Sequence, residues 1–392
     1  MKTGIYLHVP FCRARCTYCD FNTYVGLEST YEPYVRALQS EIRRVGNGEG
    51  GMGNAQSSPS PFPIPPPRAH TIFFGGGTPS LLQPEWIGEL VRTCRETFEM
   101  PAQFETTMEC NPGTVTLEYF QAVREHGVNR LSFGAQSADP EELKLLGREH
   151  TFEQVERAIQ YSRTAGFDNI NFDLIFGLPN QKVETWRRTL DAALAIHPEH
   201  ISLYALTIEN GTPMYDWVKR GTVPYPDPDA AADMYDYAEE TLGAAGYDHY
   251  EISNWCKPGH ECQHNLIYWR NEPYFGLGAG AHSSSIDRRW WKVRRPADYI
   301  ARASKGESLE MNHEDIDDRT SRGETIMLGL RLLNEGLETA RFANRYGAPL
   351  EQFYAKEIDE GLKLGLLDVS AERIKLTEKG HFLSNRVMEM FV

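Results

Sequence analysis

The sequence of 392 residues predicts an α/β fold with a parallel sheet, followed by a small winged-helix-like α+β domain. Over the first two-thirds of the chain, short apolar runs alternate with amphipathic helical stretches, which is typical of a parallel sheet covered by helices. Six such units are too few for a closed eight-fold barrel, so a partial (β/α)6 barrel and an open sheet both fit. From about Thr320 the pattern changes to a pair of helices, a short hairpin and a further helix.

The strand and helix units follow one another in regular order along the chain. We expect strands at Gly4–Val9, Thr71–Phe74, Phe104–Glu109, Arg130–Phe133, Asn169–Ile175 and His200–Leu206. Helices are expected at Thr30–Val45, Pro84–Phe98, Leu117–His126, Phe152–Ala165, Val183–Ala195 and Asp229–Gly243. In both candidate architectures, the functional residues belong at the carboxyl ends of the strands.

Changes in composition divide the chain into three regions. We expect residues 1–245 to form the core, 246–315 a segment that caps the barrel, and 316–392 the small C-terminal domain. Gly46–Arg68 interrupts the core with Gly-, Ser- and Pro-rich sequence of low complexity, which predicts a disordered surface insertion. A proline-rich docking motif is the less favoured interpretation of this segment.

The charge of the chain argues against one broad class of function. Forty basic residues stand against fifty-five acidic ones, which gives a net charge of −15. Such a balance disfavours broad electrostatic binding to nucleic acid or to an anionic membrane. We therefore expect no nucleic-acid partner, at most peripheral membrane association, and a structural role for the winged-helix-like domain. The basic stretch Asp287–Pro296 is interpreted as a solvated surface.

The lengths of the apolar runs in the sequence favour a reducing compartment. The start of the chain has no apolar run of signal-peptide length, and no stretch reaches the ~20 apolar residues that a membrane helix needs. A cytoplasmic location is expected. Thiols stay reduced there, so clustered cysteines bind metal more readily than they form disulfides.

Three of the seven cysteines, Cys12, Cys16 and Cys19, lie together in "HVPFCRARCTYCDF", directly after the first strand. Three thiolates with the spacing C-x3-C-x2-C can each bind one iron of a [4Fe–4S] cluster, which leaves the fourth iron open to a small molecule. Zinc is the main competitor, but a structural zinc site needs a fourth ligand close by. His8, on the preceding strand, is the only nearby candidate for that ligand.

With this cysteine loop, the sequence resembles the radical S-adenosylmethionine (SAM) enzymes. The resemblance implies a partial radical SAM barrel with a [4Fe–4S] cluster whose open iron is chelated by SAM. It also implies that an external electron donor reduces the cluster, which then cleaves SAM to a 5′-deoxyadenosyl radical. In such proteins the cofactors carry the difficult chemistry, and the chain supplies binding and shielding.

Further motifs follow the later strands. The glycines of "FFGGGTPS" (Phe73–Ser80) let a ligand approach the backbone closely, and the absence of a following Lys makes a phosphate-binding P-loop a poor fit. Glu109, Gln136, Arg148 and Asp173 fall at or after strand ends. Carboxylates at such positions can bind ribose hydroxyls, and an arginine can hold a carboxylate through two hydrogen bonds.

The resemblance is strongest to the branch that contains oxygen-independent coproporphyrinogen III oxidase and the heme chaperone HemW. It covers essentially the whole chain outside the insertion, and includes Tyr6 six residues before the first cysteine, the motifs "GGGTP", "GAQS", "GREH" and "DLIFGLP", and the small C-terminal domain. Carried over at these matching positions, the resemblance implies SAM contacts at Tyr6, Gly76, Gly77, Thr78, Glu109, Gln136, Arg148 and Asp173.

Two features of the oxidases are missing from this sequence. The oxidases have a further cysteine two residues after the third, where this chain has Phe21, and they have an N-terminal extension, whereas here the first cysteine is residue 12. In their place stands "HNLIYW" (His264–Trp269), which resembles the H-N-x-x-Y-W heme-binding signature of the chaperones. The resemblance implies heme contacts at His264, Asn265, Tyr268 and Trp269.

The chemistry of this motif is suitable for heme. A neutral imidazole such as that of His264 can ligate heme iron, and aromatic side chains can pack against a flat macrocycle. A buried aromatic cluster with a hydrogen-bonded histidine is the alternative, and neighbouring residues offer alternative ligands: Cys256, His260, Cys262 and His282. Cys94 and Cys110 are expected to be ordinary buried thiols.

Two hypotheses about function remain. The first is a heme chaperone that binds a [4Fe–4S] cluster, SAM and heme, and delivers heme to apo-proteins, with a homodimer as a reasonable assembly. The second is an oxygen-independent coproporphyrinogen III oxidase, which decarboxylates its porphyrinogen in heme biosynthesis by SAM-dependent radical chemistry. The sequence alone leaves open whether the protein is an enzyme.

Overall fold

The centre of the protein is a curved parallel sheet. In the computed structural model, which describes residues 1–48 and 67–392, six strands lie side by side in the order of the sequence. They are β1 (Gly4–Val9), β2 (Thr71–Gly76), β3 (Glu105–Cys110), β4 (Arg130–Gln136), β5 (Ile170–Phe176) and β6 (His200–Ala205). All five pairings between neighbours are parallel, so the carboxyl ends of the six strands meet at one rim. The predicted partial barrel is confirmed.

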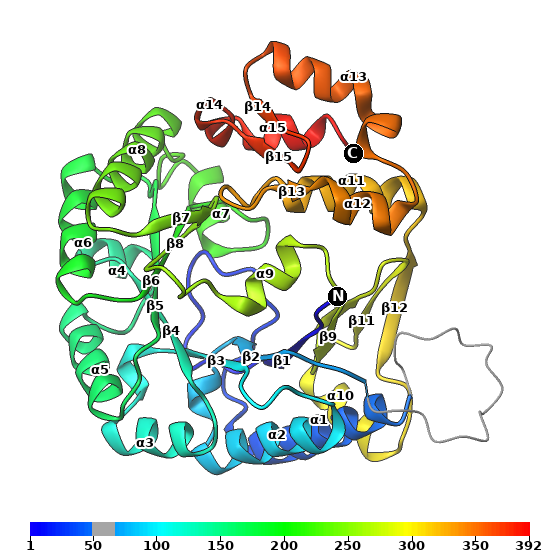
Figure 1. Ribbon diagram of the computed structural model, residues 1–392. Coiled ribbons are helices and arrows are strands. Elements are labelled where there is room, and N and C mark those ends of the chain that lie inside the picture. Colours follow the sequence, from blue (N-terminus) through cyan, green and yellow to red (C-terminus); the bar gives the residue numbers. More distant parts are fainter. Residues whose placement is uncertain (49–66) are drawn as a thin grey trace, which may run out of the picture.

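Helices cover the outer face of this sheet (Figure 1). They are α1 (Tyr31–Gly46), α2 (Pro84–Thr97), α3 (Leu117–Glu125), α5 (Phe152–Thr164), α6 (Val183–Ala195) and α8 (Pro228–Ala244). In α1 the buried residues Tyr34, Leu38, Ile42 and Val45 recur every three or four positions, so one face packs against the strands. Each of these helices begins and ends within two residues of its predicted bounds. The predicted insertion falls largely on residues 49–66, outside the described residues.

Two short helices after β4 and β6 were not expected from the sequence. They are α4 (Pro140–Leu145) and α7 (Pro213–Lys219), and both begin with proline. The preceding residues, Asp139 and Thr212, accept hydrogen bonds from main-chain N–H groups of the first turn, as N-cap residues do. Single 3-10 turns occur at Glu28–Thr30, Pro79–Leu81 and Pro112–Thr114.

Residues beyond 245 extend the same sheet at both edges. On the β6 side lie β8 (Asn254–Cys256) and β7 (Asp248–Glu251). On the β1 side, β9 (Tyr274–Leu277) pairs in parallel with β1, and β10 (His282–Ser284), β11 (Arg288–Lys292) and β12 (Glu310–Asp315) follow antiparallel. The segment that was expected to cap the barrel therefore adds edge strands, and α10 (Pro296–Ser304) packs against α1. The domain boundaries themselves stay a prediction.

One helix of this segment lies on the inner side of the curved sheet. Helix α9 (Gln263–Trp269) is in contact with β2 and with the first helix of the C-terminal region, α11. In Figure 1 it crosses the open centre of the ring of strands. Because the backbone N–H groups of Gln263 and His264 donate to the Glu105 carboxylate at the start of β3, this helix is fixed near the amino ends of the strands.

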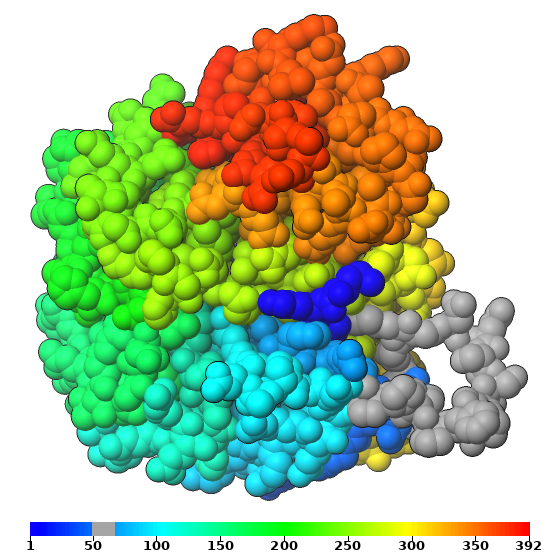
Figure 2. Space-filling model, in the orientation of Figure 1, coloured from blue at the N-terminus to red at the C-terminus, as the bar shows by residue number. Residues whose placement is uncertain are grey.

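The C-terminal domain has its own small core. It contains α11 (Asp318–Gly329), α12 (Thr339–Tyr346), α13 (Leu350–Lys363), α14 (Glu378–Phe382) and α15 (Ser384–Glu389). Its antiparallel sheet has the order β13 (Leu337–Glu338), β15 (Arg373–Leu376) and β14 (Leu367–Val369). Buried side chains such as Ile326, Phe342, Leu350 and Ile374 form one cluster separate from that of the barrel. This arrangement confirms the predicted small α+β domain, which Figure 2 shows in orange and red on one side of the barrel.

Among the described residues, none of the helices combines the length and the apolar character that a membrane crossing requires.

Candidate functional site

A cavity of about 620 Å³ occupies the interior of the barrel, between the cysteine loop and helix α9. All fifteen predicted site residues except Trp269 line this one cavity. They come from β1 and the loop after it, from the carboxyl ends of β2 to β5, from the segment after α4, and from α9. Sequence positions that are more than 250 residues apart therefore face a common space.

The cysteine loop is held in place by backbone contacts to two sides. At its start, the Cys12 N–H donates to the Tyr24 carbonyl at 2.9 Å. At its centre, Thr17 donates from its N–H to Leu146 (3.1 Å) and from its hydroxyl to Leu145 (2.7 Å), while its carbonyl accepts from Met214 (2.9 Å). The two short helices that the sequence did not predict, α4 and α7, are thus the parts that position the loop.

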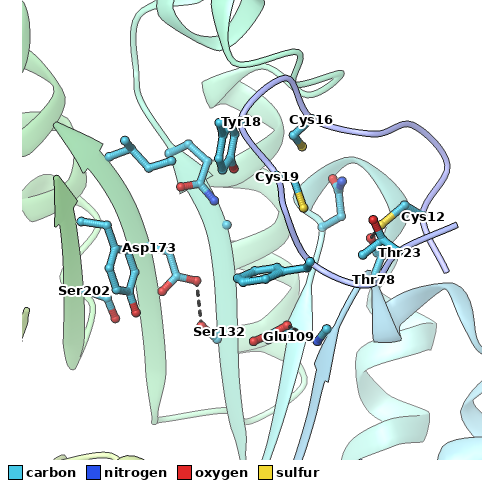
Figure 3. Close-up of a pocket in the computed structure, with 18 of the residues that line it drawn as sticks. Cys12, Cys16, Tyr18, Cys19, Thr23, Thr78, Glu109, Ser132, Asp173 and Ser202 are labelled. Carbon is cyan, nitrogen blue, oxygen red and sulfur yellow. Dashed lines mark hydrogen bonds between the residues drawn. The ribbon is translucent and has the colours of Figure 1, made fainter. Parts of the chain in front are cut away.

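The thiols lie over the carboxyl ends of the strands (Figure 3), and each of the three is partly exposed. The Arg148 guanidinium donates to Cys16 Sγ at 3.3 Å, and the Thr78 hydroxyl donates to Cys12 Sγ at 3.6 Å. Burial raises the pKa of the Cys12 and Cys19 thiols. A metal that binds here must displace the thiol protons. The positive charge of Arg148 stabilises the Cys16 thiolate that forms.

The spacing of the sulfurs allows a test of the two metal interpretations. Ligands of a single tetrahedral zinc ion stand about 3.5–4 Å from one another. Among the described residues, no group of three ligand atoms that includes a cysteine sulfur has all its members within 4.8 Å of one another. The wider spread suits a cluster in which each thiolate binds a different iron.

His8, the suggested fourth zinc ligand, is engaged elsewhere. Its Nδ1 lies 3.0 Å from the Tyr6 hydroxyl, and its Nε2 lies 3.0 Å from the Asn22 carbonyl. The side chain is buried and does not line the cavity. The donor set that faces the cavity therefore fits an iron–sulfur cluster with one open iron better than a closed zinc site.

The glycine motif brings two backbone segments into close contact. A Cβ atom on Gly77 would lie 2.5 Å from the Phe11 carbonyl oxygen and 2.8 Å from that of Val9. Gly76 has a φ of 109°, and a Cβ there would lie 2.3 Å from Cε1 of the His8 ring. The N–H groups of Gly77 and Thr78 donate to Val9 and Phe11, so the motif is fastened to the strand that carries the cysteines. Only glycine fits this cradle.

Two carboxylates, Glu109 of β3 and Asp173 of β5, line the cavity on either side of β4 (Figure 3). Glu109 accepts from the Gly76 N–H at 3.1 Å, and burial, with the nearby Asp173 charge, raises its pKa to about 8. Asp173 accepts from the Ser132 hydroxyl (3.0 Å) and the Asn171 amide (2.9 Å). Burial raises the pKa of Asp173 as well, against the effect of these hydrogen bonds. Both groups can accept hydrogen bonds from a polar ligand.

Arg148 and Gln136 complete the rim. Besides its contact with Cys16, Arg148 donates to the Gly134 carbonyl at 2.9 Å, and its Nε is buried without a hydrogen-bond partner among the described residues. Gln136 has a φ of 67°, a left-handed conformation that is uncommon for a residue other than glycine. Both side chains line the cavity, and a guanidinium is a group that can hold a carboxylate through two hydrogen bonds.

The opposite end of the cavity is formed by α9. His264 is 1% exposed, and its ring is stacked on Phe73 at a centroid distance of 5.1 Å. Its Nδ1 lies 2.7 Å from the Thr71 hydroxyl, and its Nε2 lies 2.8 Å from the Tyr268 hydroxyl. Burial, followed by the positive charge of Arg130, lowers the pKa of His264 to about 3, so the imidazole is neutral. A neutral ring is the form that ligates iron, but both nitrogens already have partners.

Trp269, unlike the other three predicted heme contacts, does not line the cavity. It lies on the far side of α9 and packs with Tyr250, Cys256, Leu266 and Leu332. The Arg331 guanidinium lies 4.2 Å from the centre of one of its rings. Seven residues of α9 make fewer than two full turns, and the positions of Tyr268 and Trp269 point about 100° apart around the axis. Trp269 therefore connects the helix to the C-terminal domain.

The sequence interpretation missed polar residues that line the cavity from within the strands. These are Arg130, Ser132, Asn171, Ser202 and Tyr204. In β4, β5 and β6 they occur at every second position of otherwise apolar runs, and side chains two apart in a strand share one face. This alternation is a usable signal for the lining of the barrel. Of the predicted buried thiols, Cys94 lies outside this space, whereas Cys110 borders it.

Comparisons with known proteins agree with this geometry. The model of the Radical SAM superfamily matches residues 64–193, and that of the HemN C-terminal domain matches residues 317–383. The structure of the coproporphyrinogen III oxidase HemN from Escherichia coli superposes with a TM-score of 0.81 over 100% of this chain and 90% of its own, at 22% identity. That likeness supports the fold.

Relatives found by sequence have higher identity to this chain than the HemN structure has. The heme chaperone HemW of Mycobacterium tuberculosis is 35% identical over 98% of this chain and 93% of its own. The heme chaperone HemW of Escherichia coli is 34% identical over 99% of this chain and 98% of its own. The mouse radical S-adenosyl methionine domain-containing protein 1, a mitochondrial protein, is 38% identical over 73% of this chain and 61% of its own. The chain belongs to the HemW family within the radical SAM superfamily.

Proposed function

We propose that this protein is a heme chaperone, which binds a [4Fe–4S] cluster and SAM at one end of the barrel cavity and heme at the other. The supporting observation is that fourteen residues predicted for these ligands line one cavity, with the cysteines at its rim and His264 at its opposite end. The full-length likeness to relatives named heme chaperone HemW points to the same activity.

At the rim, each group of residues has a separate role. Cys12, Cys16 and Cys19 would hold the cluster, and Arg148 would stabilise the thiolate of Cys16. The glycine motif and the Glu109 and Asp173 carboxylates would bind SAM through its polar groups. When bound, the cluster and SAM would supply electron transfer and bond cleavage that no side chain can perform.

At the other end, heme would replace contacts that the chain now makes within itself. Iron ligation by His264 Nε2 requires the Tyr268 hydroxyl to move away, because that hydroxyl lies 2.8 Å from the same nitrogen. The Thr71 hydroxyl at Nδ1 would keep the ring oriented. Competition between an internal hydrogen bond and iron weakens heme binding, which suits a protein that must release its cargo.

The partners follow from this assignment. Apo-proteins that accept heme, and a donor of electrons for the cluster, are the proposed partners, and a homodimer is the proposed assembly. We propose the cytoplasm as the compartment, because three clustered, partly exposed thiols need a reducing environment to remain available.

The decisive experiment is an anaerobic heme titration of the full chain followed by transfer to a heme-free globin. Wild type should bind one heme per chain, and His264→Ala should bind at least about tenfold more weakly, a loss of roughly 1.4 kcal/mol or more. His282→Ala is the matched control, because His282 is exposed and stacks on Trp291 in the edge strands, outside the cavity. Equal binding by wild type and His264→Ala would remove His264 from the proposal, and failure of transfer would remove the chaperone role.

A separate incubation addresses the oxidase alternative. Phe21, which stands where the oxidases have a further cysteine, lines the rim of the cavity and is 64% exposed. With the cluster reconstituted, SAM and a strong reductant present, coproporphyrinogen III should be recovered unchanged by mass spectrometry. Loss of two carboxyl groups would instead make the protein an oxidase.

A further inference from the structure

Three potential metal ligands meet where the C-terminal domain contacts the barrel. Glu239 belongs to α8, His249 to β7 and His381 to α14. One ligand atom from each of these residues lies within 4.8 Å of the other two. In Figure 1 the three elements lie at the same upper corner of the molecule, away from the cysteine loop. None of the three residues lines the barrel cavity.

The geometry is close to that of a three-ligand metal site. Glu239 Oε1 lies 3.3 Å from His249 Nδ1 and 3.8 Å from His381 Nδ1. Ligands bound to zinc at 2.0–2.1 Å in a tetrahedral arrangement stand about 3.3 Å apart. The Glu239–His249 pair already has this spacing, and a small shift of His381 would complete the set. The side chains of His249 and His381 are 12% and 15% exposed, and Glu239 is 31% exposed, so water can reach the group.

The surroundings of His249 direct its Nδ1 toward the centre of the group. Its Nε2 lies 3.3 Å from the Ile252 carbonyl oxygen, which can only accept a hydrogen bond. With its proton on Nδ1, the ring donates to Glu239 Oε1 at 3.3 Å. With its proton on Nε2, the ring donates to the Ile252 carbonyl, beside the Tyr235 hydroxyl at 3.3 Å, and presents the lone pair of Nδ1 to the group, which is the form that a metal would bind. The ring is stacked on Trp255 at a centroid distance of 3.9 Å, so it cannot easily turn. A second partner that fixes the tautomer of a histidine is characteristic of metal sites.

His381 provides a second, independent indication. Its Nδ1 is buried and has no hydrogen-bond partner among the described residues, because Glu239 is too distant at 3.8 Å. An unpartnered buried nitrogen costs free energy that a bound cation would recover.

We propose that Glu239, His249 and His381 form a binding site for a divalent transition metal of the zinc type, which fastens the C-terminal domain to the barrel. Two imidazoles and one carboxylate are donors that zinc accepts, with water in the fourth position. Since α14 contributes one ligand and the barrel contributes two, the bound ion links two separately packed cores. The site is independent of the proposed heme and SAM binding.

The test uses the full chain in two forms. In the first, the cluster is reconstituted, zinc is added, loosely bound metal is removed with a weak chelator, and retained zinc is measured by mass spectrometry. In the second, Cys12, Cys16 and Cys19 are all changed to serine, so that thiols cannot compete, and Co²⁺ is added as an absorbing probe. Circular dichroism verifies that each variant is folded.

We expect about one zinc per wild-type chain and tetrahedral Co²⁺ bands without a thiolate charge-transfer band. His381→Gln and Glu239→Gln should each weaken binding at least about tenfold. His313→Gln is the matched control, because His313 also faces a glutamate, Glu310, at 3.2 Å but lies on the exposed edge strand β12. Equal zinc retention by wild type and His381→Gln, or none by wild type, would overturn the site.

A second readout tests the fastening role. Hydrogen exchange in α14 and α15 should slow at least about threefold when zinc is added to wild type, and should not respond in His381→Gln. Zinc binding without any change of exchange in these helices would contradict the link between the two cores, even if the ion is retained.

Discussion

The two ends of the barrel cavity differ in how far their polar groups are already satisfied within the chain. At the cysteine end, three thiols are partly exposed, and the Arg148 guanidinium has an Nε without a partner among the described residues. At the α9 end, both ring nitrogens of His264 and its main-chain N–H have partners at 2.7–3.0 Å. One end is ready for a ligand, whereas the other must first give up internal contacts.

This difference affects how tightly each end of the cavity can bind a ligand and how easily it can release it. A preformed set of donors binds its ligand without a conformational cost and holds it firmly. A site that exists only after internal hydrogen bonds break binds less tightly and releases more easily. This contrast supports the proposal of a resident cofactor at the rim and a transient cargo at the opposite end, and each of the following predictions tests one side of it.

The largest effect is expected from Cys16→Ala. Loss of one of three thiolates should reduce the iron content of the reconstituted protein at least about tenfold, because a cluster with two protein ligands is not retained. Heme affinity should stay within about twofold if the two ends act separately. Cys94→Ala, which removes a fully buried thiol of α2 outside the cavity, should keep its iron. Normal iron content in Cys16→Ala would remove Cys16 from the ligand set.

Gly77→Ala should be the next most damaging change. The added methyl group would meet the Phe11 carbonyl at 2.5 Å, so the motif or the cysteine loop must shift. We expect a loss of about 2–3 kcal/mol in the free energy of unfolding. SAM binding should weaken about tenfold or more in calorimetry.

A matched glycine serves as the control for this change. Gly243 lies within α8 with no atom near the position of a Cβ, so Gly243→Ala should increase stability by up to about 1 kcal/mol. SAM affinity should be unchanged in that variant. If Gly77→Ala bound SAM as tightly as Gly243→Ala does, the glycine motif would not form the SAM cradle.

The carboxylates at the rim predict a pH dependence of the unliganded protein. Burial raises the pKa of Glu109 from 4.5 to about 8, so the folded state keeps a proton that the unfolded state has lost. Stability should therefore be greatest below about pH 4.5, as far as this group is concerned, and should fall as pH rises toward about 8. Since the carboxylate still faces the cavity, we expect a change on the order of 1–2 kcal/mol. Denaturant unfolding at pH 5.5 and 8 should show it in wild type and a flatter profile in Glu109→Gln.

The smallest effect concerns the opposite end. Tyr268→Phe removes the hydroxyl that lies 2.8 Å from His264 Nε2, so heme no longer competes with an internal hydrogen bond worth about 1 kcal/mol. Heme affinity should rise about fivefold in an absorbance titration, and transfer to an apo-globin should slow. Weaker binding, as in His264→Ala, would mean that the hydroxyl itself contacts the heme, and that this end is preformed as well.

The sequence predicted the central strands well, and it predicted that polar residues at their carboxyl ends would lie near one another. Strands such as β5 are apolar runs buried on both faces, and their polar residues at the carboxyl ends meet because parallel strands share an edge. The cysteine spacing and the glycine motif are local patterns, so their placement needed no knowledge of distant contacts.

The parts that were missed depend on contacts between distant segments. The strands β7 to β11 have only three to five residues each, and their place in the sheet, like that of β12, is decided by partners that no local pattern reveals. Trp269 follows Tyr268 directly, yet the helix sends the two side chains to different surroundings. The position of His264 beneath β2 arises from Glu105, which lies far away in the sequence and fixes the start of α9.

The pairing of β1 with β9 has a consequence for synthesis of the chain. Of the described strands, β1 is made first, and it finds its second neighbour only when Tyr274–Leu277 has been made. Until then it has an open edge, and unpaired strand edges invite association between nascent chains. Contacts between such distant positions also slow folding. We therefore expect fragments that end before Tyr274 to aggregate more readily than the full chain, because the strand that precedes the cysteine loop keeps an unpaired edge in them.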